Sequence, residues 1–135
     1  MKLISYLPLE NRVAERLQEV LEATVLTDEI EIYRTIESLA GRLRQPGTDQ
    51  MIAVLLAAAG KDLSDILSIR ELFEDIKIIL ILPDGERSTI SGGHKLYPRF
   101  VCCADSDFSD VAAVLGKMLE NSNFSKGSKG NKKTR

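Results

Sequence analysis

The chain has 135 residues, of which 44% are hydrophobic and 28% charged, a composition typical of one globular domain. No run approaches the roughly 18 apolar residues of a membrane-spanning helix. The short apolar start that ends at Pro8 lacks the features of a secretory signal, so we expect a cytoplasmic protein. Two adjacent cysteines, Cys102 and Cys103, and a single histidine, His94, exclude a disulfide framework and a conventional zinc site.

The first half of the chain alternates predicted strands and helices. The apolar run 2–7 is typical of a buried strand, and apolar residues at three- and four-residue steps over 9–23 predict a helix. Residues 28–34 alternate as in a strand near a sheet edge, and the apolar spacing over 36–43 predicts a short helix that stops at Pro46-Gly47.

The second half contains two strongly apolar segments. Residues 51–59 carry no polar side chain and residues 78–82 are fully apolar, as expected for central parallel strands covered on both faces. Between them, a helical stripe runs from Leu63 to Ile76, with Asp62 or Ser64 as its cap. The remaining predicted elements are a short or irregular helix over 86–96, a strand over 99–104 and a helix capped by Asp107 that extends to 121.

Five strands that alternate with five helical segments require parallel crossover connections. The sequence therefore predicts an α/β fold for residues 1–121: a flavodoxin-like, doubly wound five-stranded parallel sheet with strand order 2-1-3-4-5. Residues 122–135 are rich in Ser, Asn, Gly and Lys, which predicts a disordered tail.

The net charge of −2 is the sum of two unlike parts. The last ten residues carry five basic side chains and no acid, which leaves −7 on residues 1–125. A basic tail is able to contact nucleic acid or an anionic membrane. This one has no aromatic or amphipathic partner to specify a site, so we interpret it as a solubilising terminus and expect neither partner.

The chain resembles the receiver domain of bacterial response regulators over about residues 2–121. The resemblance lies in the architecture, the hydrophobic pattern and the segments 98–104 and 107–111, which look like the family's last strand and helix. It implies a two-component signalling role. It also implies a phosphoryl-transfer site with a Mg²⁺-binding acidic pair, an acceptor aspartate after the third strand, a hydroxyl after the fourth and a lysine after the fifth.

This sequence departs from that pattern at every position. The first strand ends at Leu7-Pro8 with Glu10 as the nearest acid, and the third ends in three alanines, 57–59. The fourth strand ends at Pro83, and Asp105 follows the fifth where the family has its lysine. Aspartyl transfer needs a metal and a cation to hold the transferred oxygens. We therefore expect a degenerate receiver, or pseudo-receiver, with no enzymatic activity and no cofactor.

Acidic residues nevertheless follow several strands. Glu10, Asp62, Asp84 and Asp105 are placed near the carboxyl edge of the predicted sheet, where α/β proteins bind ligands. Converging carboxylates would hold a divalent cation. The favoured interpretation is structural, because loop aspartates cap helices and start turns without any ligand.

Three further features have structural and functional interpretations. The segment 91–95, Ser-Gly-Gly-His-Lys, matches no phosphate-binding fingerprint and is better explained as a flexible connection. His94 has no partner at a catalytic spacing, so we expect a surface residue. We expect Cys102 and Cys103 to pack toward opposite faces of the sheet, because neighbouring side chains of a strand alternate. A redox role is the less favoured alternative, because nothing near them in sequence would lower a thiol pKa.

The preferred function is a receiver-like regulatory module that acts by protein–protein interaction, with a protein partner or a second copy of the chain. The expected interaction face covers residues 86–119 and includes Lys95, Tyr97, Arg99 and Phe100, although Phe100 is also a candidate core residue. The alternative is a small enzyme or a ligand- or metal-binding domain that uses the carboxyl-edge acids.

Overall fold

The computed structural model describes residues 2–8, 12–25, 29–45, 51–105 and 108–127, and the side chains of these up to 119. Five parallel strands form one sheet in the order β2-β1-β3-β4-β5. The strands are β1 (Lys2–Tyr6), β2 (Ile30–Tyr33), β3 (Met51–Leu56), β4 (Lys77–Leu82) and β5 (Phe100–Cys103). The helices are α1 (Arg12–Thr24), α2 (Ile36–Leu43), α3 (Gly60–Ser68), the 3₁₀ helix η3 (Arg70–Phe73), α4 (Arg87–His94) and α5 (Ser109–Gly127).

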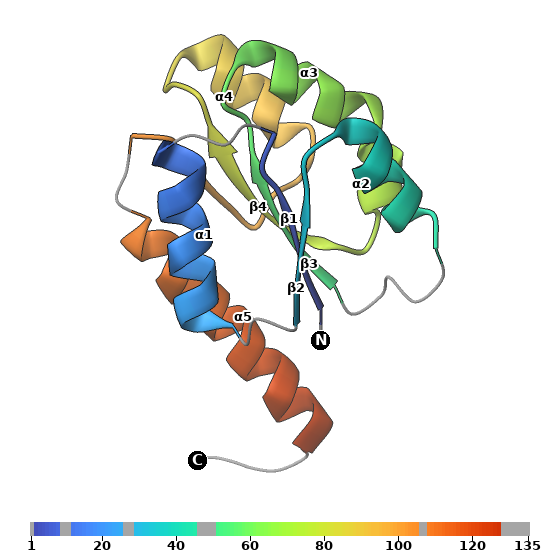
Figure 1. Cartoon of the computed structure of the whole chain (residues 1–135), viewed down its shortest axis with the longest axis vertical. Helices are drawn as coiled ribbons and strands as arrows, with labels where there is room; N and C mark the ends of the chain where they lie inside the picture. Colours follow the sequence, from blue (N-terminus) through green and yellow to red (C-terminus); the bar gives the residue numbers. More distant parts are fainter. Residues whose placement is uncertain (1, 9–11, 26–28, 46–50, 106–107, 128–135) are drawn as a thin grey trace.

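Helices cover both faces of the sheet, which confirms the flavodoxin-like fold and the strand order predicted from the sequence. Figure 1 shows α1 and α5 packed on one face and α2, α3 and α4 on the other. The predicted sheet-edge position of β2 is correct. None of the described helices combines the length and apolar composition that a bilayer crossing requires.

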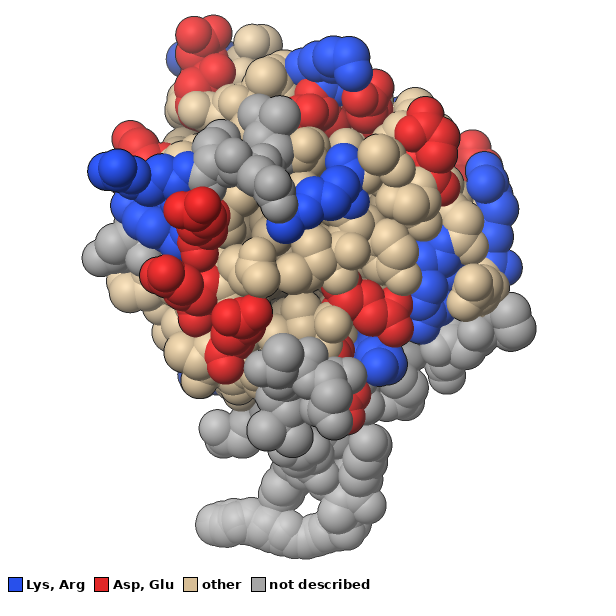
Figure 2. All heavy atoms as spheres, viewed as in Figure 1, with Lys and Arg blue, Asp and Glu red and all other residues tan. Residues whose placement is uncertain are grey.

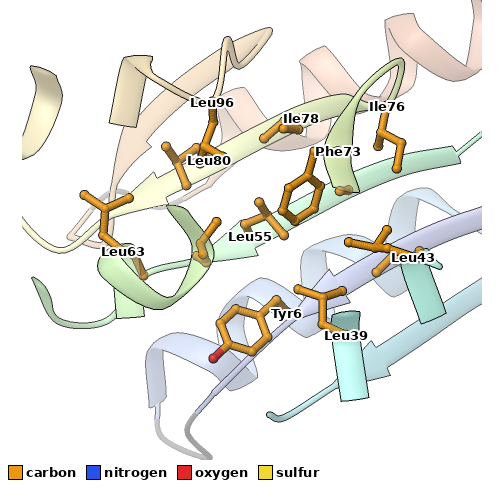
Figure 3. Packing of buried hydrophobic residues seen from close by; sticks show 14 of the residues in the cluster. Tyr6, Leu39, Leu43, Leu55, Leu63, Phe73, Ile76, Ile78, Leu80 and Leu96 are labelled. Carbon is orange, nitrogen blue, oxygen red and sulfur yellow. The ribbon is translucent and has the colours of Figure 1, made fainter. Parts of the chain in front are cut away.

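Two hydrophobic layers follow from the alternation of side chains along the strands. Every residue of β3 is buried; Ala53 and Leu55 face the α2–α3–α4 side, whereas Ile52 and Val54 face α1 and α5. In Figure 3, the Phe73 ring of η3 lies near Leu55 and Ile78 within the first of these layers. The central strands are therefore the apolar segments that the sequence marks most clearly.

A polar cluster closes the β2 edge of the first layer. Glu31 Oε1 accepts a hydrogen bond from Arg42 Nε of α2 at 2.7 Å and from the Tyr33 hydroxyl at 2.8 Å, and Lys2 Nζ lies 3.7 Å from Glu31 Oε2. Burial alone would raise the pKa of Glu31, but these hydrogen bonds and the two cations lower it. The cluster fixes α2 against the edge strand.

Two expected elements differ in the structure. The stripe from Leu63 to Ile76 is not one helix: α3 ends at Ser68 and η3 follows, so that Phe73 and Ile76 reach the core from a tighter turn. The last helix does not stop at 121 but continues to Gly127, into the segment expected to be disordered. Residues 128–135, the predicted Asp107 cap and the expected stop at 46–47 lie outside the described residues.

The short helix predicted over 86–96 is present as α4, whereas the interpretation of the Gly-rich segment 91–95 as a flexible connection is wrong, because residues 91–94 belong to that helix. Gly92 and Gly93 belong to α4, where a Cβ at Gly93 would lie 2.9 Å from Leu80 Cδ2 and 3.1 Å from Leu82 Cδ2. The missing side chain lets α4 approach β4 closely. This packing accounts for a glycine pair in a helix that local propensity disfavours.

Candidate functional site

At the carboxyl edge of the sheet, where the fold usually places its chemistry, main-chain groups make the described polar contacts around the end of β3. Ala57 is fully buried after β3, and its N–H donates to Ile81 O at 2.8 Å. Asp62 Oδ2 accepts hydrogen bonds from the N–H groups of Ala58 and Ala59, both at 3.0 Å. The nearest carboxylate to the end of β3 therefore holds the start of α3.

The other candidate ligands that the structure describes at this edge do not converge on a metal site. Asp84 Oδ1 accepts from the Glu86 N–H at 2.9 Å, the geometry of an Asx turn, and Asp105 is exposed. Glu10 lies outside the described residues. Among the residues that the structure describes, no three His, Cys, Asp or Glu side chains form a group suited to a metal ion. The structural interpretation of Asp62 and Asp84 is thus supported.

Arginines tie the loops of the carboxyl edge together. Arg16 Nη2 of α1 donates to Ala104 O at 3.4 Å, and its guanidinium lies 5.2 Å from the centre of the Phe108 ring. Arg34 Nη1 donates to Leu7 O at 3.3 Å. These cations bond carbonyl oxygens of the chain, which stabilises the β1 and β5 ends of this edge.

Tyr6 is a buried side chain that the sequence reasoning did not single out. Burial, followed by the negative charges of Asp62, Asp65 and Glu37, raises the pKa of its phenol to about 12. Figure 3 shows its hydroxyl pointing away from the apolar cluster. At neutral pH this hydroxyl is protonated, which disfavours a role as a base or nucleophile.

The cysteines and the histidine occupy unremarkable positions. Cys102 packs with the α1–α5 layer, whereas Cys103 Sγ lies beside Gly85 on the α4 side, as the alternation in the sequence predicts. His94 is exposed at the end of α4, together with Ile90 along a shallow groove. These positions match the structural interpretation of each residue.

A cavity of about 750 Å³ lies at the opposite, amino edge of the sheet. The segment 70–75 precedes β4 and the segment 95–97 precedes β5; because the two strands are parallel neighbours, their preceding segments meet. Phe73 and Leu96 are buried members of the core beneath this opening. The lining residues are Arg70, Glu71, Phe73, Glu74, Asp75, Lys95, Leu96 and Tyr97.

Tyr97 is the most conspicuous residue of this cavity. It is 89% exposed and has φ 53°, a left-handed conformation that bulky residues rarely adopt. The cause is local, since the Tyr97 N–H bonds His94 O in the turn that ends α4, immediately before Pro98. Glycine usually occupies such a position, so the tyrosine side chain costs backbone strain and gains no burial.

The four residues expected on an interaction face separate in the structure. Lys95 and Tyr97 line the cavity together, and Arg99 is exposed next to them while its N–H donates to Ile78 O at 2.8 Å. Phe100 is partly buried and packs with the α1–α5 layer, which agrees with its alternative role in the core. The amino-edge partners in 70–75 were missed, because no sequence motif marks them.

The charge on the face seen in Figure 2 is mixed, with Lys and Arg interspersed among Asp and Glu. Acidic side chains run down the left of this view, over α1, whose Glu15, Glu19 and Glu22 are exposed. No protein-family model matches the chain, and no curated protein matches it either.

Proposed function

We propose that the chain is a receiver-like regulatory module that acts by protein–protein contact, without phosphorylation of an aspartate. The parallel sheet in the order 2-1-3-4-5 supports the receiver-like part of this proposal. Ala57 at the end of β3 and the main-chain bonds of Asp62 support the absence of phosphoryl chemistry, because no free carboxylate follows the strand.

The observation that carries the proposal is the exposed Tyr97. A tyrosine offers a large, rigid and amphipathic contact area, and such residues dominate the binding energy of protein interfaces. Strained backbone positions persist where function requires them. Tyr97 combines both features beside a cavity that also includes Lys95, one of the residues expected on the interaction face.

The test has two parts. After incubation of the full chain with acetyl phosphate and Mg²⁺, intact-mass spectrometry is expected to show no phosphoryl adduct. Affinity capture from the native host is then compared between the wild-type chain, Tyr97→Ala and Ile90→Ala. Ile90 is the matched control, because it is the other large apolar side chain exposed among the described residues.

We expect a set of proteins that the wild type and Ile90→Ala retain and Tyr97→Ala loses. An acylphosphate adduct would contradict the phosphorylation-independent mechanism. A capture profile that is identical for all three chains would contradict the interaction role of Tyr97.

A further inference from the structure

We draw no further inference here: the strongest candidate, the amino-edge cavity between the segments 70–75 and 95–97, carries charges of both signs once the neighbouring Lys77 and Arg99 are counted, and nothing in the described part of the structure shows what covers it.

Discussion

Asp75 and Tyr97 line one cavity from segments that precede neighbouring strands, and both adopt a left-handed backbone, with φ of 69° and 53°. They are two of the three non-glycine residues with positive φ in the described part of the chain. The third, Phe108, is fully buried and packs in the core. Burial offsets the strain at Phe108, whereas the exposed Asp75 and Tyr97 have no such compensation.

Tyr97→Gly is expected to stabilise the fold. A left-handed conformation costs a residue with a Cβ about 1–2 kcal/mol, and part of that gain is offset by the greater chain entropy of glycine in the unfolded state. We expect a net increase of about 0.5–1 kcal/mol in the free energy of unfolding, measured by urea denaturation followed by circular dichroism. Tyr97→Ala keeps the Cβ and is the control: a gain as large as that of glycine would show that strain at Tyr97 is not the cause.

Gly93→Ala is expected to destabilise the protein. The added methyl group would lie 2.9 Å from Leu80 and 3.1 Å from Leu82, two fully buried side chains. Overpacking costs about 1–3 kcal/mol and exceeds the gain of roughly 1 kcal/mol that alanine brings to a helix. The control is Gly41→Ala in α2, where an added Cβ would meet nothing within 4 Å beyond its own helix backbone and the same change is expected to stabilise. Thermal unfolding of both variants measures the difference, and an unchanged midpoint for Gly93→Ala would refute the close approach of α4 to β4.

Glu31 is expected to contribute stability that depends on pH. Burial disfavours the charged form and raises the pKa of Glu31. The hydrogen bonds from Arg42 and Tyr33 outweigh this effect and lower the pKa below the ordinary value of 4.5. A carboxylate with a lowered pKa in the folded state stabilises the protein above its unfolded pKa and loses that contribution as the pH falls through the folded pKa. The stability difference between the wild type and Glu31→Gln should therefore be constant above about pH 5.5 and shrink in acid. Denaturant titrations at several pH values measure it, and a difference that grows in acid would contradict the cluster.

The phenol of Tyr6 is expected to lose its proton at a higher pH than an ordinary tyrosine. Burial first, and then the charges of Asp62, Asp65 and Glu37, raise the pKa of its phenol to about 12. A raised phenol pKa means that its contribution to stability is complete below about pH 10 and is lost as the pH rises through 12. The ¹³Cζ resonance of Tyr6 followed by NMR gives the midpoint, and Tyr6→Phe assigns the signal. A midpoint near 10 would show that the hydroxyl is hydrated and distant from the three acids.

The sequence contains most of the information about the layers of this fold. The run Ile78 to Leu82 has no polar alternation, and only a strand with helices on both faces buries every side chain of such a run. The structural role of Asp62 was predicted, but its place was not: α3 begins at Gly60 after Ala59, and Asp62 holds this start from within the first turn by accepting hydrogen bonds from the Ala58 and Ala59 N–H groups.

The amino-edge cavity could not be predicted from the sequence, and the reason is physical. Glu74 and Tyr97 are brought together only by the parallel pairing of β4 and β5, and neither segment has a periodicity or motif of its own. Similarly, the sequence predicted a short helix over 86–96 but not the close approach of Gly93 to Leu80 and Leu82, which is a tertiary contact. Packing between distant segments decides such features, and local patterns do not report it.

We propose that the protein contacts a partner through Tyr97. The most direct test of this proposal replaces Tyr97 with the photo-crosslinking residue p-benzoylphenylalanine in the native host, with the same replacement at Lys61, an exposed position on α3, as the control. We expect discrete crosslinked proteins from position 97 in the absence of any phosphorylation, and none of them from position 61. No crosslink at 97, or the same products at both positions, would contradict it.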